Sequence, residues 1–162
     1  MLWTNRIFCG MIKDSVYLRD RQMRNLGGIK SMRKVVKFGG SSLASAEQFK
    51  KVGDIIRADK GRKYVVPSAP GKRFDGDIKV TDMLYACYAK AEKKEDITAS
   101  IAAIRERYME IINGLGLSLS LDDQFEVISE NFKKLAGSNY AASRGEYLNG
   151  IIMANYLGYE FI

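Results

Sequence analysis

The stretch Lys34-Val35-Val36-Lys37-Phe38-Gly39-Gly40-Ser41-Ser42 decides the fold. Its run Val35–Phe38 is apolar, β-branched and bounded by two glycines, which predicts a short buried strand. A strand that passes through glycines into a helix presents free backbone N–H groups and a positive dipole end to an anion above the turn. The stretch therefore predicts a phosphate-binding turn.

Lys37 supports this interpretation, because burying an unpaired ammonium in a strand is costly unless an anion meets it. The P-loop pattern is absent, since its lysine follows the last glycine of a longer loop. Taken alone, a Gly-Gly-Ser-Ser turn is also typical of a purely structural connection between a strand and a helix.

The residues after this turn predict a parallel α/β arrangement. A capping box at Ser45 opens a helix that closes near Gly61, and Tyr64–Val66 predicts a second strand that ends in the loop Pro67–Gly71. A strand, a helix and a strand of this length form a βαβ unit with a parallel sheet. Further elements are expected in this order: helices from Thr81, over 97–115, from Ser120 to Gly137 and from Ser143 to Gly158, then a new strand at Tyr159–Ile162.

Composition narrows the class of protein. The 162 residues, 46% of them hydrophobic, suffice for one domain or for a large piece of a bigger one. No stretch is long and apolar enough for a membrane span or resembles a signal peptide, so we expect a soluble, cytoplasmic protein without a membrane partner. The chain has no histidine, and Cys9 and Cys87 lie far apart, which excludes Ser/His and Cys/His nucleophiles and predicts no protein metal site.

The net charge of +7 is unevenly distributed. Residues 1–31 contribute +4 and residues 32–162 only +3, so no basic stripe for nucleic acid is expected. Residues 1–31 are predicted to be an unstructured or mistranslated leader, because Gly27-Gly28 would be encoded by a ribosome-binding sequence ahead of Met32. A transit peptide is the other interpretation, and Asp14 and Asp20 disfavour it.

Three polar residues are further candidates for a site. Ser68 follows the second strand and Thr81 opens the next helix, at positions where parallel α/β sheets bind ligands. Glu146 belongs to the block Ser143-Arg144-Gly145-Glu146. Each has a structural alternative: Ser68 and Thr81 as turn or cap residues, and Glu146 as the end of a capping box.

Taken together, these residues resemble aspartate kinases of the single-function bacterial type. The matching blocks occur in the same order: Lys37-Phe38-Gly39-Gly40-Ser41-Ser42, Val65-Val66-Pro67-Ser68-Ala69-Pro70-Gly71, Thr81 and Ser143-Arg144-Gly145-Glu146. The resemblance implies the amino-acid kinase fold, a three-layer α/β/α sandwich with a mainly parallel sheet. Residues 32–162 would form its N-terminal, aspartate-binding portion, incomplete at the C-terminus.

The resemblance also implies a reaction and its residues. The γ-phosphoryl group of ATP would pass to the side-chain carboxylate of L-aspartate with Mg²⁺, in the first step towards lysine, threonine and methionine. Lys37 would neutralise charge on that group, and Gly39, Gly40 and Ser41 would donate to the phosphates. Aspartate would be held by Ser68, Thr81 and Glu146, with Glu146 facing its ammonium.

Members of this family continue into a nucleotide-binding half and regulatory ACT domains, and full-length members are expected to be homo-oligomers. Neither part lies within residues 32–162, so we expect the 162-residue chain itself to be inactive. Two alternatives stay open: a non-catalytic fragment that binds a partner chain, and another amino-acid kinase that acts on glutamate or acetylglutamate.

Overall fold

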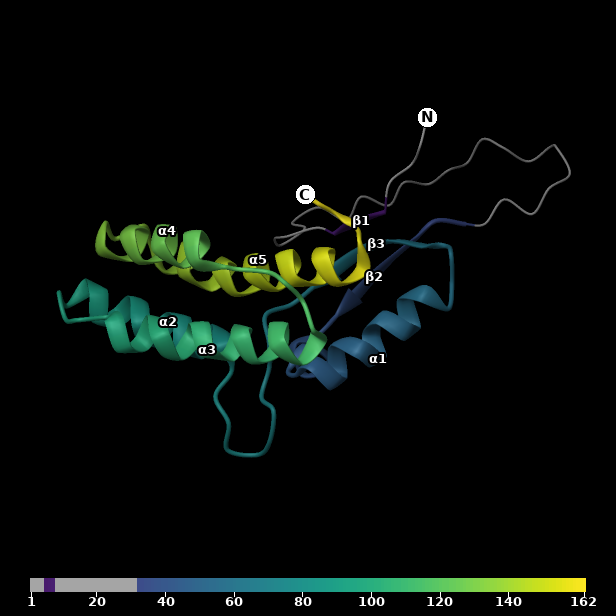
Figure 1. Ribbon diagram of the computed structural model, residues 1–162. Coiled ribbons are helices and arrows are strands. Elements are labelled where there is room, and N and C mark those ends of the chain that lie inside the picture. The colour runs from purple at the N-terminus through teal and green to yellow at the C-terminus, as the bar shows by residue number, and fades with distance from the viewer. Residues whose placement is uncertain (1–4, 8–31) are drawn as a thin grey trace, which may run out of the picture.

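Four parallel strands form one sheet in the computed structural model, which describes residues 5–7 and 32–162 (Figure 1). Their order is β2-β3-β1-β4, and every neighbouring pair is parallel. The strands span Arg6–Ile7 (β1), Lys34–Phe38 (β2), Arg62–Pro67 (β3) and Glu160–Phe161 (β4). The predicted βαβ unit is therefore confirmed, with β2 directly beside β3.

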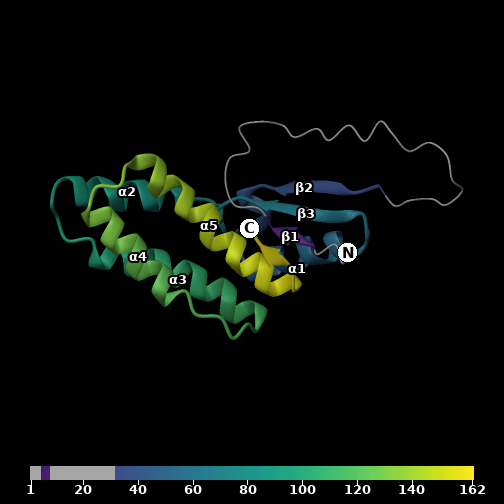
Figure 2. The same cartoon turned by 90° about the horizontal axis from the view of Figure 1, so that it is seen from above.

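Five α-helices and one short 3₁₀ helix complete the described chain. Their bounds are Gly40–Leu43 (η1), Ala46–Arg57 (α1), Val80–Glu92 (α2), Thr98–Leu115 (α3), Asp122–Lys133 (α4) and Ser138–Leu157 (α5). Figures 1 and 2 show that α2, α3 and α4 extend away from the strands, while α5 runs from this group back to the sheet. None of the helices that the structure describes is both long and apolar enough to cross a lipid bilayer.

One face of the sheet packs against the helices. A row of side chains in register across the strands makes this contact: Val36, Val65, Ile7 and Phe161. Ile7 and Val65 are completely buried, whereas Val35, which points to the other face, is 60% exposed. The α/β class with a parallel sheet is thus confirmed, while a second helical layer, as in a three-layer sandwich, is not formed by the described helices.

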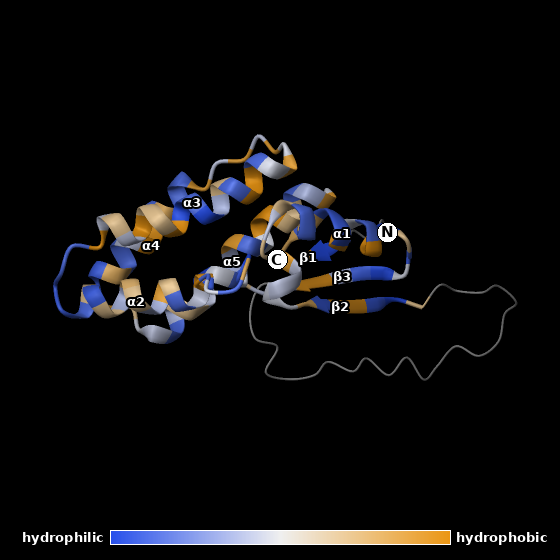
Figure 3. Cartoon of the chain, turned by 90° about the horizontal axis from the view of Figure 1, so that it is seen from below, coloured by the Kyte–Doolittle hydropathy of each residue, from blue (hydrophilic) through white to orange (hydrophobic). Residues whose placement is uncertain are grey.

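The core lies between this face and the helices, and α1 and α4 each present one apolar stripe to it, whereas α5 is buried on several sides by neighbouring helices and strands. Figure 3 shows hydrophobic and hydrophilic residues alternating along the helices, as expected for elements with one buried face. Helices α5 and α3 pack especially closely on their neighbours: a Cβ at Gly150 would lie 2.6 Å from the Phe161 ring, and one at Gly114 would lie 2.6 Å from the Ala46 Cβ.

Three predicted helix starts are wrong. Helix α2 begins at Val80 after Lys79, with no side-chain cap, so Thr81 lies inside the first turn. Helix α4 follows Leu121, and Ser120 only accepts a hydrogen bond from the Asp122 N–H. Helix α5 begins at Ser138, because the chain turns at Gly137, whose φ of 100° favours glycine.

The sheet also contains a strand that the sequence did not predict. Residues Arg6–Ile7 form β1 between β3 and β4, within the segment predicted to be an unstructured leader. The backbone N–H of Glu160 donates to the Asn5 carbonyl at 2.9 Å, which ties this strand to the end of the described chain. Residues 1–4 and 8–31 lie outside the described residues, so the leader itself stays a prediction.

Candidate functional site

The glycine turn lies at the C-terminal end of β2. Gly39 adopts an extended conformation, and η1 follows with the Ser42 N–H donating to the Gly39 carbonyl at 3.1 Å. A Cβ at Gly39 would meet nothing within 4 Å, so the space beside this residue is open. The first N–H groups of a helix have no acceptor within the helix, and the first N–H groups of η1 are those of the glycine turn.

The predicted start of the following helix at Ser45 is confirmed, but a short 3₁₀ helix separates that helix from the glycine turn. The chain enters only the four-residue η1, and α1 begins at Ala46, where the Ser45 hydroxyl accepts from the Gln48 N–H at 3.5 Å. The N-terminus of the long helix is therefore capped by Ser45. Positive potential at the turn comes from its own N–H groups and from Lys37.

Lys37 is exposed on the sheet face that the described helices leave open. The expectation that it is buried is wrong, because Lys37 lies on the same face of β2 as Val35, which is 60% exposed. Its ammonium forms no ion pair with a described carboxylate, in contrast to Lys34 on the same strand, which pairs with Asp59 at 2.7 Å. Lys37 thus presents an uncompensated positive charge beside the turn.

The loop 68–71 lies directly against the glycine turn. The Ser68 N–H donates to the Phe38 carbonyl at 3.0 Å, and the Gly71 N–H donates to the Gly40 carbonyl at 2.8 Å. A Cβ at Gly40 would lie 2.8 Å from the Ala69 carbonyl oxygen, so glycine is required for this approach. The first two sequence blocks are therefore joined backbone to backbone.

The other two blocks meet the same loop. At the start of α2, the Val80 N–H donates to the Pro70 carbonyl at 3.1 Å, which places the neighbouring Thr81 at the end of the loop. On α5, a Cβ at Gly145 would lie 2.7 Å from the Ala69 Cβ, which places Glu146 next to this contact. All four blocks thus converge on the loop 68–71.

The candidate side chains are available to a ligand. Ser68, Thr81 and Glu146 are half-buried. Within the described residues, no side-chain hydrogen bond or ion pair involves any of them. Half-buried hydroxyls and a carboxylate without protein partners can accept and donate hydrogen bonds to a small polar molecule.

The capping-box alternative for Glu146 is wrong. Helix α5 starts five residues before Ser143, whose hydroxyl donates to the Tyr140 carbonyl at 2.8 Å within the helix. Glu146 therefore has no role in starting the helix.

The neighbouring Arg144 has aromatic contacts. Its guanidinium lies between two rings, 4.5 Å from the centroid of Tyr140 and 4.7 Å from that of Tyr147.

Two polar residues near the loop were not predicted from the sequence. Arg107 on α3 donates from Nη2 to the Gly71 carbonyl at 2.9 Å, and Asn149 on α5 donates from Nδ2 to the Ser68 carbonyl at 2.6 Å. The only signal in the sequence is that each polar residue interrupts an apolar stripe, as Arg107 does between Ile104 and Ile111.

Asp77, in the loop before α2, joins this group. Its carboxylate accepts from Arg73 Nε at 2.9 Å and from Arg107 Nη1 at 2.5 Å. Hydrogen bonds from Arg73 first, and then from Arg107, hold the pKa of the Asp77 carboxyl well below its usual range, although burial opposes this shift. Asp77 is therefore ionised at neutral pH.

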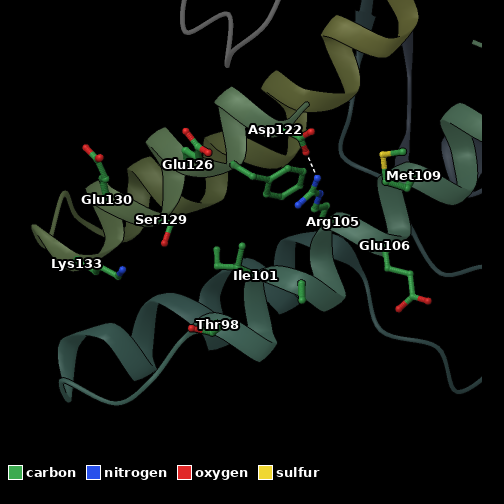
Figure 4. A pocket seen from close by; sticks show the side chains of 12 residues that line it. Thr98, Ile101, Arg105, Glu106, Met109, Asp122, Glu126, Ser129, Glu130 and Lys133 are labelled. Carbon is green, nitrogen blue, oxygen red and sulfur yellow. Dashed lines mark hydrogen bonds and ion pairs between the residues drawn. The ribbon is translucent and has the colours of Figure 1, made fainter. Parts of the chain in front are cut away.

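The described chain contains no cluster of metal ligands, and its groove lies apart from the candidate site residues. No cluster of three or more Cys, Asp or Glu side chains suited to a metal occurs in residues 5–7 and 32–162. A groove of about 930 Å³ runs between α3 and α4, with the Arg105–Asp122 ion pair across it (Figure 4). None of the predicted site residues lines this groove.

The fold and the candidate site define a parallel α/β protein with a glycine turn at the carboxyl end of a strand, the edge at which such sheets bind ligands. More narrowly, the chain belongs to the amino acid kinase family, whose model matches residues 32–160.

Individual relatives narrow the similarity to aspartate kinases. Aspartokinase 3 of Bacillus subtilis (strain 168) is 40% identical over 135 residues, which cover 78% of this chain and 29% of the relative. The crystal structure of Clostridium acetobutylicum aspartate kinase matches with a TM-score of 0.76 at 49% identity, over 79% of this chain and 30% of that chain. The resemblance inferred from the sequence blocks is confirmed.

A more distant structure supports the fold alone. Escherichia coli aspartokinase III in complex with aspartate and ADP matches with a TM-score of 0.54 at 24% identity, over 76% of this chain and 28% of that chain. The chain thus spans less than a third of the length of each of these relatives.

Proposed function

We propose that residues 32–162 form the aspartate-binding part of an aspartate kinase, which transfers the γ-phosphoryl group of ATP to the side-chain carboxylate of L-aspartate. The convergence of the four sequence blocks on the loop 68–71 carries this proposal. It is supported by 49% identity to an aspartate kinase of known structure and by 40% identity to Aspartokinase 3 of Bacillus subtilis. The product would enter lysine, threonine and methionine synthesis.

Lys37 and the glycine turn would act on the phosphates. An uncompensated ammonium attracts the transferring group, and the N–H groups of Gly39, Gly40 and Ser41 together with the Ser41 hydroxyl would donate to its oxygens. The acceptor carboxylate of aspartate is already ionised at neutral pH. No general base is needed, and catalysis consists of positioning and charge stabilisation.

Ser68, Thr81 and Glu146 would hold the amino acid. The hydroxyls of Ser68 and Thr81 can donate to its carboxylates, and the Glu146 carboxylate can accept from its ammonium. Because Glu146 has no cationic partner among the described residues, its charge is available for this contact.

ATP is the proposed co-substrate and would bring Mg²⁺ on its phosphates, where the ion neutralises developing charge. We assign no described residue to the ion. We also propose a cytoplasmic location and, by analogy with full-length family members, a homo-oligomer.

The direct test is ADP formation by the product of the complete reading frame that contains these 162 residues. Aspartate, glutamate and acetylglutamate are compared at equal concentration with ATP and Mg²⁺. ADP formation only with aspartate is expected, and turnover of another acceptor in its place would reject the substrate. A chimera in which residues 32–162 replace the matching part of the C. acetobutylicum enzyme tests these residues independently of the rest of the frame.

The non-catalytic alternative has its own test. We expect the 162-residue chain alone to form no ADP, because catalysis would need the remaining length of its relatives. Aspartate-dependent ADP formation by this chain would contradict that expectation. If the chimera is also inactive while the parent enzyme is active, the partner-binding alternative is favoured.

A further inference from the structure

Two polar side chains, Arg107 and Asn149, are buried in the core of the chain that the structure describes. Arg107 on α3 is 4% exposed, and Asn149 on α5 is completely buried. The other buried side chains of this core are almost all apolar or aromatic. Such residues need a specific explanation, because burying polar groups is unfavourable unless they are hydrogen-bonded.

Both side chains donate to the same four-residue loop. Asn149 Nδ2 lies 2.6 Å from the Ser68 carbonyl oxygen, and Arg107 Nη2 lies 2.9 Å from that of Gly71. These carbonyls belong to the first and last residues of the loop 68–71. Two different helices therefore hold the two ends of one loop through buried donors.

Each held residue also bonds to the β2 side of the site. Ser68 donates its N–H to the Phe38 carbonyl, and Gly71 donates its N–H to the Gly40 carbonyl. A displacement of either loop residue would move its N–H together with its carbonyl, because both flank one Cα. Arg107 and Asn149 thus help to fix the distance between the loop 68–71 and the glycine turn.

The charge of Arg107 is itself held in place. Asp77 accepts from Arg107 Nη1 at 2.5 Å, and Arg73 Nη1 in turn donates to Glu110 on α3 at 2.7 Å while its Nε holds Asp77. This network fixes the plane of the guanidinium, so that Nη2 is aimed at Gly71.

Core stability alone does not require these two residues. Arg107 Nε and Asn149 Oδ1 are buried without a hydrogen-bond partner among the described residues. Apolar side chains of similar volume stabilise a core as well as a buried charge does, or better. What Arg107 and Asn149 share is that both donate hydrogen bonds to the loop 68–71.

We infer that Arg107 and Asn149 are positioning residues that clamp the loop 68–71 against the glycine turn. Neither touches the reacting atoms: Asn149 sets the place of Ser68, and Arg107 sets the place of Gly71 and through it Gly40. The kinetic part of this inference rests on the proposed function, whereas the clamp itself is a property of the fold.

Amide hydrogen exchange in the 162-residue chain, followed by NMR, tests the clamp. Arg107→Met is expected to speed exchange of the Gly71 N–H by about fivefold or more, and Asn149→Leu that of the Ser68 N–H. The matched controls are Arg105→Met and Asn155→Leu, exposed positions on the same two helices. Smaller changes in folded variants, or equal changes in the controls, would overturn the inference.

A measurement on the wild-type chain tests the clamp even if the variants do not fold. In the wild-type chain the side-chain amide protons of Asn149 are expected to exchange about tenfold more slowly than those of the exposed Asn155. The side-chain N–H protons of Arg107 are expected to show the same protection relative to Arg105. Equal exchange in either pair would contradict the clamp.

Kinetics of the product of the complete reading frame separate positioning from a structural role. Assayed below its own unfolding midpoint, Asn149→Ser is expected to raise the KM for aspartate with little change in kcat, and Arg107→Lys is expected to lower kcat. A structural role alone would lower the midpoint and leave both constants of the folded enzyme unchanged. If the wild type forms no ADP with aspartate, the proposed function fails, while hydrogen exchange still decides on the clamp.

Discussion

Gly71 donates its backbone N–H to the Gly40 carbonyl at 2.8 Å, and neither glycine leaves room for a side chain on the other. This contact joins the turn after β2 to the loop after β3. The ends of two strands, Phe38 and Pro67, which are 29 positions apart in the sequence, thereby form one surface next to Lys37 and Ser68.

Gly71→Ala is expected to destabilise the chain by about 1–3 kcal/mol, because its Cβ would lie 2.7 Å from the Gly40 carbonyl carbon, and backbone on both sides would have to move. Chemical denaturation of the 162-residue chain measures this loss.

Gly39→Ala is the matched control, since a Cβ there meets nothing within 4 Å and its φ of −75° suits any residue. Its free energy of unfolding should stay within about 0.5 kcal/mol of the wild type. A loss as large as that of Gly71→Ala would contradict the described packing of the turn.

Glu146→Gln should raise the KM for aspartate about tenfold or more and leave the KM for ATP unchanged, because the amide keeps the shape but loses the charge that faces the ammonium. Helix α5 should be unaffected, since Glu146 has no role in its cap. Steady-state assays of the product of the complete reading frame give both constants.

Glu92→Gln, at the exposed end of α2, serves as the control and should change neither KM. An unchanged KM for aspartate in Glu146→Gln would remove Glu146 from the site.

Asp77→Asn should destabilise the chain by about 1–3 kcal/mol at pH 7, because it takes the carboxylate from the buried Arg107. The pKa of Asp77 is depressed in the folded state by Arg73 first and then by Arg107. A depressed folded pKa stabilises above the unfolded value, near 3.9, and this contribution is lost as the pH falls below it.

The free-energy difference between wild type and Asp77→Asn should therefore shrink as the pH is lowered from about 5 towards 3. Unfolding followed by circular dichroism at several pH values measures it. Asp75→Asn, an exposed carboxylate in the same loop, is the control. A difference that is constant with pH would show that the Asp77 charge does not stabilise the fold.

Local patterns predicted much of the fold. The β-branched run at β2 and the capping box at Ser45 are short-range signals, and the βαβ unit that they imply is present. The start of α5 was misplaced because Gly137 was interpreted only as the end of the preceding helix. Strand β1 was missed because two residues, Arg6–Ile7, have no periodicity, and their neighbours in the sheet come from distant segments.

The site was predicted only in part for a related reason. The order of the blocks identified Lys37, Ser68, Thr81 and Glu146, and their backbones meet at one loop, while their roles stay proposals. Arg107 and Asn149 were missed because their partners are main-chain carbonyls 36 and 81 positions away. A carbonyl has no side-chain identity, so no residue pattern reveals such a contact.

Removal of the Lys37 charge tests the central claim most directly. The product of the complete reading frame, or the chimera that carries residues 32–162, is assayed for aspartate-dependent ADP formation as wild type, Lys37→Ala and Lys34→Ala. Lys34 is on the same strand but is already paired with Asp59. The account predicts that Lys37→Ala abolishes turnover and Lys34→Ala keeps it, and equal turnover by Lys37→Ala and wild type would contradict it.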